Sequence, residues 1–251
     1  MTCEGVRTWE FEKEACMKIM VVHGQYPAAE VELRRKHVLA AASPGTQIEF
    51  AEIKGDIFGL SHNADSELLI MLAGPQVVEK AKEAQKRGLD AVVPYGGLDI
   101  GVDAARSQVD IPVVGMGRSG FCIAASMATR LGAIVYQSMA IPNAWKAIRQ
   151  TGLESFVISI RSVDISLKDM TAQSPLLKER LFEMGKRMIH EDGVEVLVIK
   201  GVSLVPNHCS AEELSREVKV PVIDCVTAGI KMAEMLVSMG LGNSRKAYPA
   251  P

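Results

Sequence analysis

Three polar side chains end short apolar runs of the sequence, and their types could move a proton or bind an anion. His23 ends the first such run, and histidine can act as an acid or a base near neutral pH. Lys200 ends a later run, where a lysine is costly unless it is paired or faces a polar cavity. It could bind an anionic substrate or, with a lowered pKa, act as a base. Tyr95 follows a third run and could donate to an oxyanion.

Arg118 lies at the expected start of a helix, directly after another apolar run. Its guanidinium could hold a carboxylate through two parallel hydrogen bonds, and the backbone N–H groups of Ser119 and Gly120 could add to this binding. Each candidate also has a structural interpretation. The histidine could be hydrogen-bonded within the core, the lysine and the arginine could extend to solvent, and the tyrosine ring could pack on a cleft wall.

The composition excludes several other classes of function. The 251 residues carry a formal net charge of −2 with both signs spread along the chain, so no basic surface for nucleic acid is expected. No apolar run reaches the roughly 18 residues of a membrane span, and no signal-peptide pattern is present, which predicts a cytoplasmic protein. The cysteines form no CxxC pair and no zinc spacing, so we expect free thiols and no metal (Cys3, Cys16, Cys122, Cys209 and Cys225).

Short runs rich in valine and isoleucine alternate with longer amphipathic segments along most of the chain. Such runs are typical of buried parallel strands. The expected strands are 18–23, 47–53, 91–94, 113–115, 133–137, 156–160, 196–199 and 222–224. The expected helices include 67–87, 119–131, 142–151, 175–191 and 227–239. This alternation predicts an α/β fold with parallel sheets and helices on both faces.

An internal repeat divides this pattern into two halves. The segment 88–97 parallels 193–202, and the segment 111–115 parallels 220–224. The repeat predicts two similar lobes whose equivalent loops meet across one cleft, at the carboxyl ends of the strands. The alternative is that any two βαβ units look alike.

The repeat also carries a resemblance to a known family. The segments that resemble hydantoin racemases are 88–93, 103–106, 110–115, 220–224, 228–234 and 240–246. The chain is therefore similar to the Asp/Glu/hydantoin racemase superfamily from Met17 onward, and residues 1–16 are expected to be an N-terminal extension. The resemblance implies two pseudo-symmetric Rossmann-like lobes, catalysis without a cofactor, and assembly into a homo-oligomer.

The family's catalytic residues are the point at which this chain departs from the resemblance. Members use two cysteines, one from each lobe, on opposite faces of the substrate's α-carbon, so that one thiolate removes the proton and the other thiol returns it. The matching positions here are Gly96 and Gly201, and glycine has no side chain to move a proton. Two-thiol racemisation is thus excluded by this alignment. Arylmalonate decarboxylases of the same superfamily keep one cysteine, so losing a thiol can change the reaction.

The remaining site residues follow from the same alignment. The two glycine loops could bring backbone N–H groups close to a ligand, and Asp99 could orient a polar group or cap the following helix. The predicted catalytic residues are His23, Lys200 and Tyr95. The predicted substrate-binding residues are Gly96, Gly97, Asp99, Arg118, Ser119, Gln137, Ser138, Gly201, Val202 and Asp224.

Together these features predict a cofactor-independent isomerase or racemase-like enzyme. Its substrate would be a small carboxylate or cyclic amide that reacts through an enolate-like intermediate, with neither nucleic acid nor membrane as a partner. A decarboxylase or another carbon–carbon lyase is one alternative, and a non-catalytic metabolite-binding protein is another. The first lobe is expected to comprise residues 17–115 and 226–251, and the second lobe residues 116–225.

Overall fold

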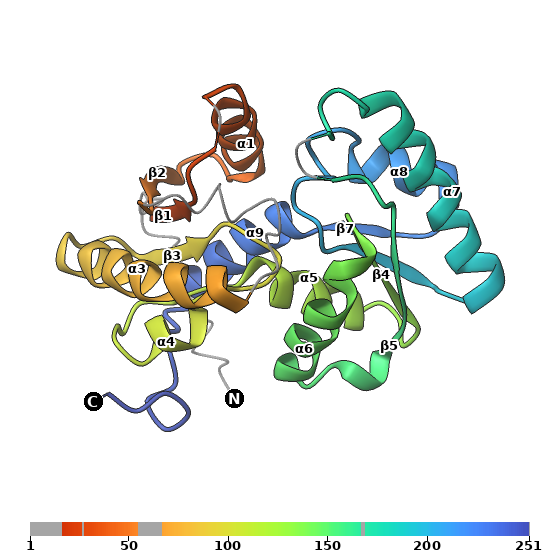
Figure 1. Ribbon diagram of the computed structural model, residues 1–251. Coiled ribbons are helices and arrows are strands. Elements are labelled where there is room, and N and C mark those ends of the chain that lie inside the picture. Colours follow the sequence, from red (N-terminus) through yellow and green to blue (C-terminus); the bar gives the residue numbers. More distant parts are fainter. Residues whose placement is uncertain (1–16, 27, 55–66, 167–168, 251) are drawn as a thin grey trace, which may run out of the picture.

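The strands of the protein form two parallel sheets. The computed structural model describes residues 17–26, 28–54, 67–166 and 169–250, so the expected extension lies outside the described residues. The first sheet has the order β2-β1-β3 and the second the order β5-β4-β6-β7. The strands are β1 (Lys18–His23), β2 (Gln47–Glu52), β3 (Ala91–Pro94), β4 (Leu131–Val135), β5 (Val157–Ser162), β6 (Val196–Ile199) and β7 (Val222–Asp224). The predicted two-lobed α/β fold with parallel sheets is confirmed (Figure 1).

Helices cover the sheets and fill the space between them. They are α1 (Ala28–Ala41), α3 (Glu67–Lys86), α4 (Val102–Arg106), α5 (Met116–Ala125), α6 (Ile141–Thr151), α7 (Ser174–Asp192), α8 (Ala211–Val218) and α9 (Cys225–Ser238). α3 packs beside the first sheet and α7 beside the second, whereas α5 and α9 pack on each other in the middle (Figure 1). α9 also contacts α1 and β3, and α5 contacts β6 and β7. The exact lobe boundaries remain a prediction.

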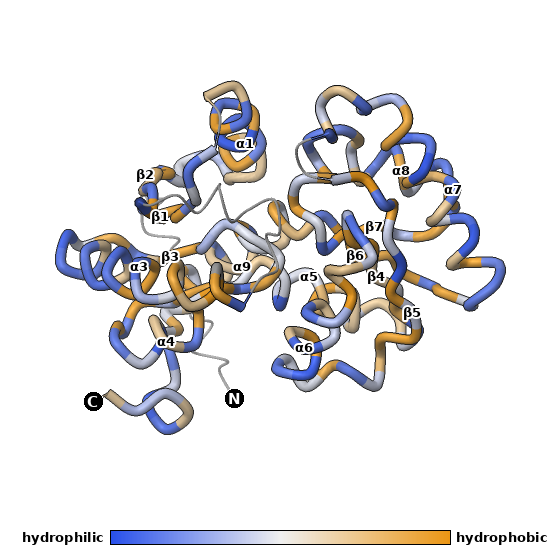
Figure 2. Tube along the Cα trace, in the orientation of Figure 1, coloured by the Kyte–Doolittle hydropathy of each residue, from blue (hydrophilic) through white to orange (hydrophobic). Residues whose placement is uncertain are grey.

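A shared core holds the two sheets in a fixed relation. One buried cluster includes Ile19 and Val93 from the first sheet, Phe121 and Ile230 from α5 and α9, and Val198 from the second sheet. Figure 2 shows hydrophilic and hydrophobic positions alternating along α3 and α7, as in helices with one face on a core. No helix of the described residues has the length and apolar composition to cross a bilayer. The core therefore fixes where the loops of the two halves come together.

One expected strand is absent from the sheets. The prediction for 113–115 is wrong, because Val113 makes a single parallel bridge with Val92 and Gly115 already serves as the N-cap of α5. The expected helix 119–131 is displaced for the same reason, since α5 starts directly after Gly115 and ends before β4 begins. The chain thus turns at once from an extended segment into a helix, which brings the N-terminus of α5 to the loop after β3.

Candidate active site

The loops after β3 and β6 are in direct contact, as the repeat predicts. The ammonium of Lys200 donates to the carbonyl oxygen of Gly97 at 2.6 Å. A Cβ atom on Gly97 would lie 2.0 Å from the carbonyl oxygen of Lys200, so no other residue fits at that position without moving the backbone. Gly96 and Gly201, the positions that the resemblance assigns to the family's two cysteines, are next to this contact in the sequence.

Lys200 is a buried residue that bridges the two halves. Its exposed fraction is 4 %, and its ammonium points to the opposite loop rather than to solvent. Burying an ammonium without partners is costly, so a buried lysine requires hydrogen-bond acceptors close to its charge. One of those groups is the Gly97 carbonyl, and a hydrogen bond to a carbonyl polarises the peptide group that follows it.

His23 is held on both ring nitrogens. Nδ1 lies 2.8 Å from the carbonyl oxygen of Gly24, and Nε2 lies 3.2 Å from Nη2 of Arg35. A carbonyl requires a proton on Nδ1 and the guanidinium requires a lone pair on Nε2, so the neutral tautomer fits. Burial lowers the pKa of His23, and Arg35 lowers it further against the raising effect of Gly24. This geometry favours the structural interpretation of His23.

Arg34 of α1 is a central residue that is not among the predicted site residues. Its side chain is 5 % exposed, and Nη2 donates to Glu30 at 2.9 Å and to the hydroxyl of Ser203 at 3.0 Å. The guanidinium carbon lies 4.0 Å from the centre of the Tyr26 ring and 5.5 Å from that of Tyr95. Arg34 therefore contacts the loops after β1, β3 and β6 at once.

The Tyr95 hydroxyl is buried beside this arginine. Burial raises the pKa of Tyr95 to about 12, although Arg34 works in the opposite direction. Burial also acts to lower the pKa of Arg34, but Tyr26, Tyr95 and Glu30 together raise it above its usual value. The hydroxyl oxygen interacts with the Arg34 guanidinium, and its proton has no acceptor among the described residues. Tyr95 is thus a protonated donor near a fixed positive charge.

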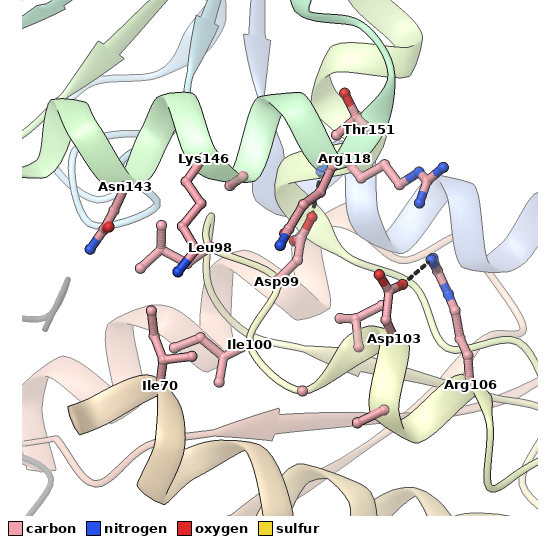
Figure 3. A pocket seen from close by; sticks show the side chains of 15 residues that line it. Ile70, Leu98, Asp99, Ile100, Asp103, Arg106, Arg118, Asn143, Lys146 and Thr151 are labelled. Carbon is pink, nitrogen blue, oxygen red and sulfur yellow. Dashed lines mark hydrogen bonds and ion pairs between the residues drawn. The ribbon is translucent and has the colours of Figure 1, made fainter. Parts of the chain in front are cut away.

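A cavity of about 270 Å³ adjoins the glycine loop after β3. It lies between the segment 98–106 and α6, and Figure 3 shows Lys146 reaching from α6 toward Leu98. The charged side chains on its wall are Asp99, Asp103, Arg106, Arg118 and Lys146. Of the predicted site residues, Asp99 and Arg118 line this cavity, whereas the residues around Lys200 do not. The predicted site is therefore divided into a loop contact and an adjoining cavity.

Two predictions about the N-terminus of α5 need correction. Asp99 caps α5 rather than the helix that follows it, because its carboxylate accepts from the backbone N–H groups of Gly117 at 2.8 Å and Arg118 at 2.7 Å. The backbone N–H of Ser119 donates within the helix to Gly115 and is not available to a ligand. Burial raises the pKa of Asp99 against the lowering effect of these hydrogen bonds.

The other predicted residues lie around the same strand ends. Asp224 caps α9, and burial raises the pKa of its carboxyl. Gln137 is half-buried and Ser138 is exposed, with the Ser138 N–H donating to Asp164 at 2.9 Å. Gly201 and Val202 are buried in the loop after β6.

Two remaining cysteines are unsuited to act as thiolates. Burial raises the pKa of the Cys209 thiol to about 12, and Glu213 raises it further. Cys225 is completely buried, and burial raises its pKa well above the usual range. The structure therefore supports not assigning the family's cysteine role to either residue.

Two parallel sheets with their equivalent loops in contact define a two-lobed α/β protein whose candidate site lies between its halves. A family model described as Asp/Glu/Hydantoin racemase matches residues 62–233, and the chain belongs to this family.

Proteins that are similar to this chain include named racemases. A hydantoin racemase of Pseudomonas sp. (strain NS671) is 29 % identical over 236 residues, which cover 94 % of this chain and 92 % of the relative. The allantoin racemase structure from Klebsiella pneumoniae is 26 % identical with a TM-score of 0.80, covering 94 % of each chain. Unliganded arylmalonate decarboxylase, at 17 % identity and a TM-score of 0.59 over 88 % of this chain and 92 % of that one, shares the fold.

Proposed function

We propose that this protein is a cofactor-independent isomerase or racemase-like enzyme that acts next to a carboxylate or cyclic-amide carbonyl through an enolate-like intermediate. The observation that carries the proposal is the contact between Gly97 and Lys200. The contact joins the loops that contain Gly96 and Gly201, the positions that the resemblance assigns to the family's thiols, and this supports a shared site without thiols. Membership of a racemase family, and relatives named hydantoin racemase, support chemistry at a carbon next to a carbonyl.

Backbone and tyrosine groups would stabilise the intermediate in place of thiols. Because Lys200 donates to the Gly97 carbonyl, the peptide N–H that follows, on Leu98, becomes a stronger donor. Leu98 also lines the cavity, where an enolate oxygen could accept from it. Tyr95 stays protonated at neutral pH because its pKa is about 12, so it would act as a donor rather than as a base.

Proton NMR in D2O tests this function. The protein would be incubated with hydantoins, amino acids, malonates and unsaturated dicarboxylates, and deuterium uptake at the α-carbon would be followed. We expect exchange with at least one class, reduced about 100-fold in Tyr95→Phe, the effect typical of losing one positioned donor. Ser238→Ala is the control, because it removes an exposed hydroxyl that donates to the Met235 carbonyl at the end of α9, away from the glycine loops and the cavity.

Lys200→Met tests the indirect role of the lysine. It should lower the exchange rate more than it changes substrate affinity, since Lys200 acts through the Gly97 peptide. The absence of exchange with the whole panel would contradict the proposal. Loss of CO2 from malonates, detected as a change in product mass, would instead identify a decarboxylase on the same fold, and the fold shared with arylmalonate decarboxylase makes this the second candidate.

A further inference from the structure

We infer that Arg34 is the anion-binding residue of this site, and that the substrate is a small carboxylate anion rather than a neutral cyclic amide. This inference rests on the proposed function for the location of the site, but it specifies the charge of the substrate. It is based on the contacts of a buried guanidinium that the predicted site did not include.

The guanidinium of Arg34 is incompletely satisfied by the described residues. Its five N–H donors belong to Nε, Nη1 and Nη2, and the hydrogen bonds to Glu30 and Ser203 both come from Nη2. Nε and Nη1 are buried and make no hydrogen bond of ordinary geometry with the described residues, although the Tyr95 hydroxyl interacts with the guanidinium. A buried donor left without an acceptor costs about 1–3 kcal/mol, so such an arrangement is expected where a ligand supplies the acceptor.

The surroundings and the shape of the guanidinium limit how an acceptor can bind. The guanidinium carbon lies over the rings of Tyr26 and Tyr95, 4.0 and 5.5 Å from their centres, where it makes cation–π contacts. The N–H groups of a guanidinium point outward in its own plane, so an acceptor binds them along the edge of that plane. On that edge Nη2 donates to Ser203, which belongs to the loop after β6.

A carboxylate matches this edge better than a neutral carbonyl does. A carboxylate takes two parallel N–H groups, one on Nη1 and one on Nη2, when one of its oxygens replaces the Ser203 hydroxyl. Glu30 pairs with Nη2 alone, at 2.9 Å, so it does not occupy the N–H groups of Nη1. Because Tyr26 and Ser203 cover the guanidinium from two different loops, separating these loops would admit the ligand.

A matched pair of probes tests the inference. Hydantoin-5-acetate and hydantoin-5-acetamide have nearly the same shape and differ in one charge, and their binding would be measured by calorimetry. The wild type should bind the acetate at least about 10-fold more tightly, as expected for a hydrogen bond to a charged group. Arg34→Gln should remove this preference, so that the two probes bind with about equal affinity.

Two control variants separate Arg34 from other cations. Lys36→Gln removes an exposed charge from the same helix, and Arg118→Gln removes the predicted carboxylate clamp of the cavity. Both should keep the preference for the acetate. Equal binding of the two probes by the wild type, a preference kept in Arg34→Gln, or a preference lost only in Arg118→Gln would each overturn the inference.

A measurement on the wild type covers the case in which Arg34→Gln fails to fold. The Nη–H resonance of Arg34, assigned with the milder Arg34→Lys variant, should shift on adding the acetate and not on adding the acetamide. An unchanged resonance at saturating acetate would refute the inference. Exchange at the α-carbon in D2O separates the two proposals: Arg34-dependent binding without exchange would leave the inference standing and remove the function, and Arg34-independent exchange would do the reverse.

Discussion

The N-termini of α5 and α9 occupy equivalent places in the two halves of the repeat, yet they are capped from different directions. Asp224 is the N-cap residue of α9 and accepts from its second and third backbone amides at 2.9 and 3.1 Å. The matching residue before α5 is Gly115, which has no side chain. Asp99, from the loop after β3, accepts from the second and third amides of α5 at 2.8 and 2.7 Å instead.

Both helix N-termini are therefore capped by a carboxylate, but the residue that supplies it stands at a different place in each half of the sequence. In the first half, the carboxylate of Asp99 binds the loop after β3 to α5. The Gly97 carbonyl of the same loop accepts from Lys200, so the loop is held on both sides of Leu98.

In the second half, the N–H of Gly201 donates to the Ile134 carbonyl at 3.3 Å and its carbonyl accepts from Leu204 at 2.8 Å. Packing adds to these bonds, since a Cβ atom on Gly201 would meet Leu204 at 2.9 Å. The two glycine loops are therefore equivalent in the repeat, but a new side chain would meet different atoms in each.

Gly97→Ala should have the largest effect, because its Cβ atom would lie 2.0 Å from the backbone oxygen of Lys200. We expect a loss of about 3 kcal/mol in the free energy of unfolding, at the upper end for an overpacked buried site. Urea denaturation measures it. The matched control is Gly24→Ala, where the nearest atom would be 3.8 Å away, on Tyr26. Similar losses in the two variants would show that the contact between the loops is not rigid.

Moving the cap should have the next largest effect. Asp99→Gly leaves two amides of α5 without their acceptor and should cost about 2 kcal/mol in the free energy of unfolding. Adding Gly115→Asp should recover at least half, because an aspartate there would cap α5 as Asp224 caps α9. Gly115→Asp alone should destabilise, since its Cβ atom would lie 2.4 Å from Cγ of Asp99. A double variant no more stable than Asp99→Gly would contradict the equivalence of the two helix ends.

The sequence predicts the strands well and the cap poorly, for a physical reason. β1, β3, β6 and β7 have the predicted bounds, because their β-branched runs end abruptly at polar or proline residues. Capping of α5 by Asp99 depends on how two segments far apart in the chain meet, which no local pattern shows. The strand expected at 113–115 is reduced to one bridge, since only the Pro112 carbonyl and the Val114 N–H bond to Val92 before Gly115 caps α5.

The burial of Arg34 could have been predicted from its position in the helical pattern of the sequence. Arg34, Val38 and Ala41 are the buried residues of α1, at a spacing that places them on one face of a helix. An arginine on the buried face requires partners, and that requirement could have been recognised from the sequence. The identity of the partners could not, because Tyr26, Tyr95 and Ser203 come from three separate loops.

Restoring a side chain at the second glycine should have a moderate effect that depends on one neighbour. Gly201→Cys should cost about 1–2 kcal/mol, because Leu204 must move and it is completely buried. Leu204→Ala is destabilising by itself, but in combination the two changes should cost at least about 1 kcal/mol less than their sum. A double-mutant cycle by urea denaturation measures this coupling. Simple additivity would show that Leu204 does not limit the loop.

Introducing a side chain at the first glycine, Gly96, should have the smallest effect. A Cβ atom on Gly96 would have no atom within 4 Å, so only its φ of 154°, at the edge of the range that favours glycine, opposes substitution. Gly96→Cys should therefore lower the free energy of unfolding by about 1 kcal/mol, all of it from backbone strain, because there is space for the side chain. Its thiol should react with iodoacetamide in the folded protein, whereas the thiol of Gly201→Cys should react far more slowly under the packing of Leu204. Equal reactivity at the two positions would remove the asymmetry between the loops. The expected difference means that a thiol can be added at one face of the site without disturbing the contact between Gly97 and Lys200.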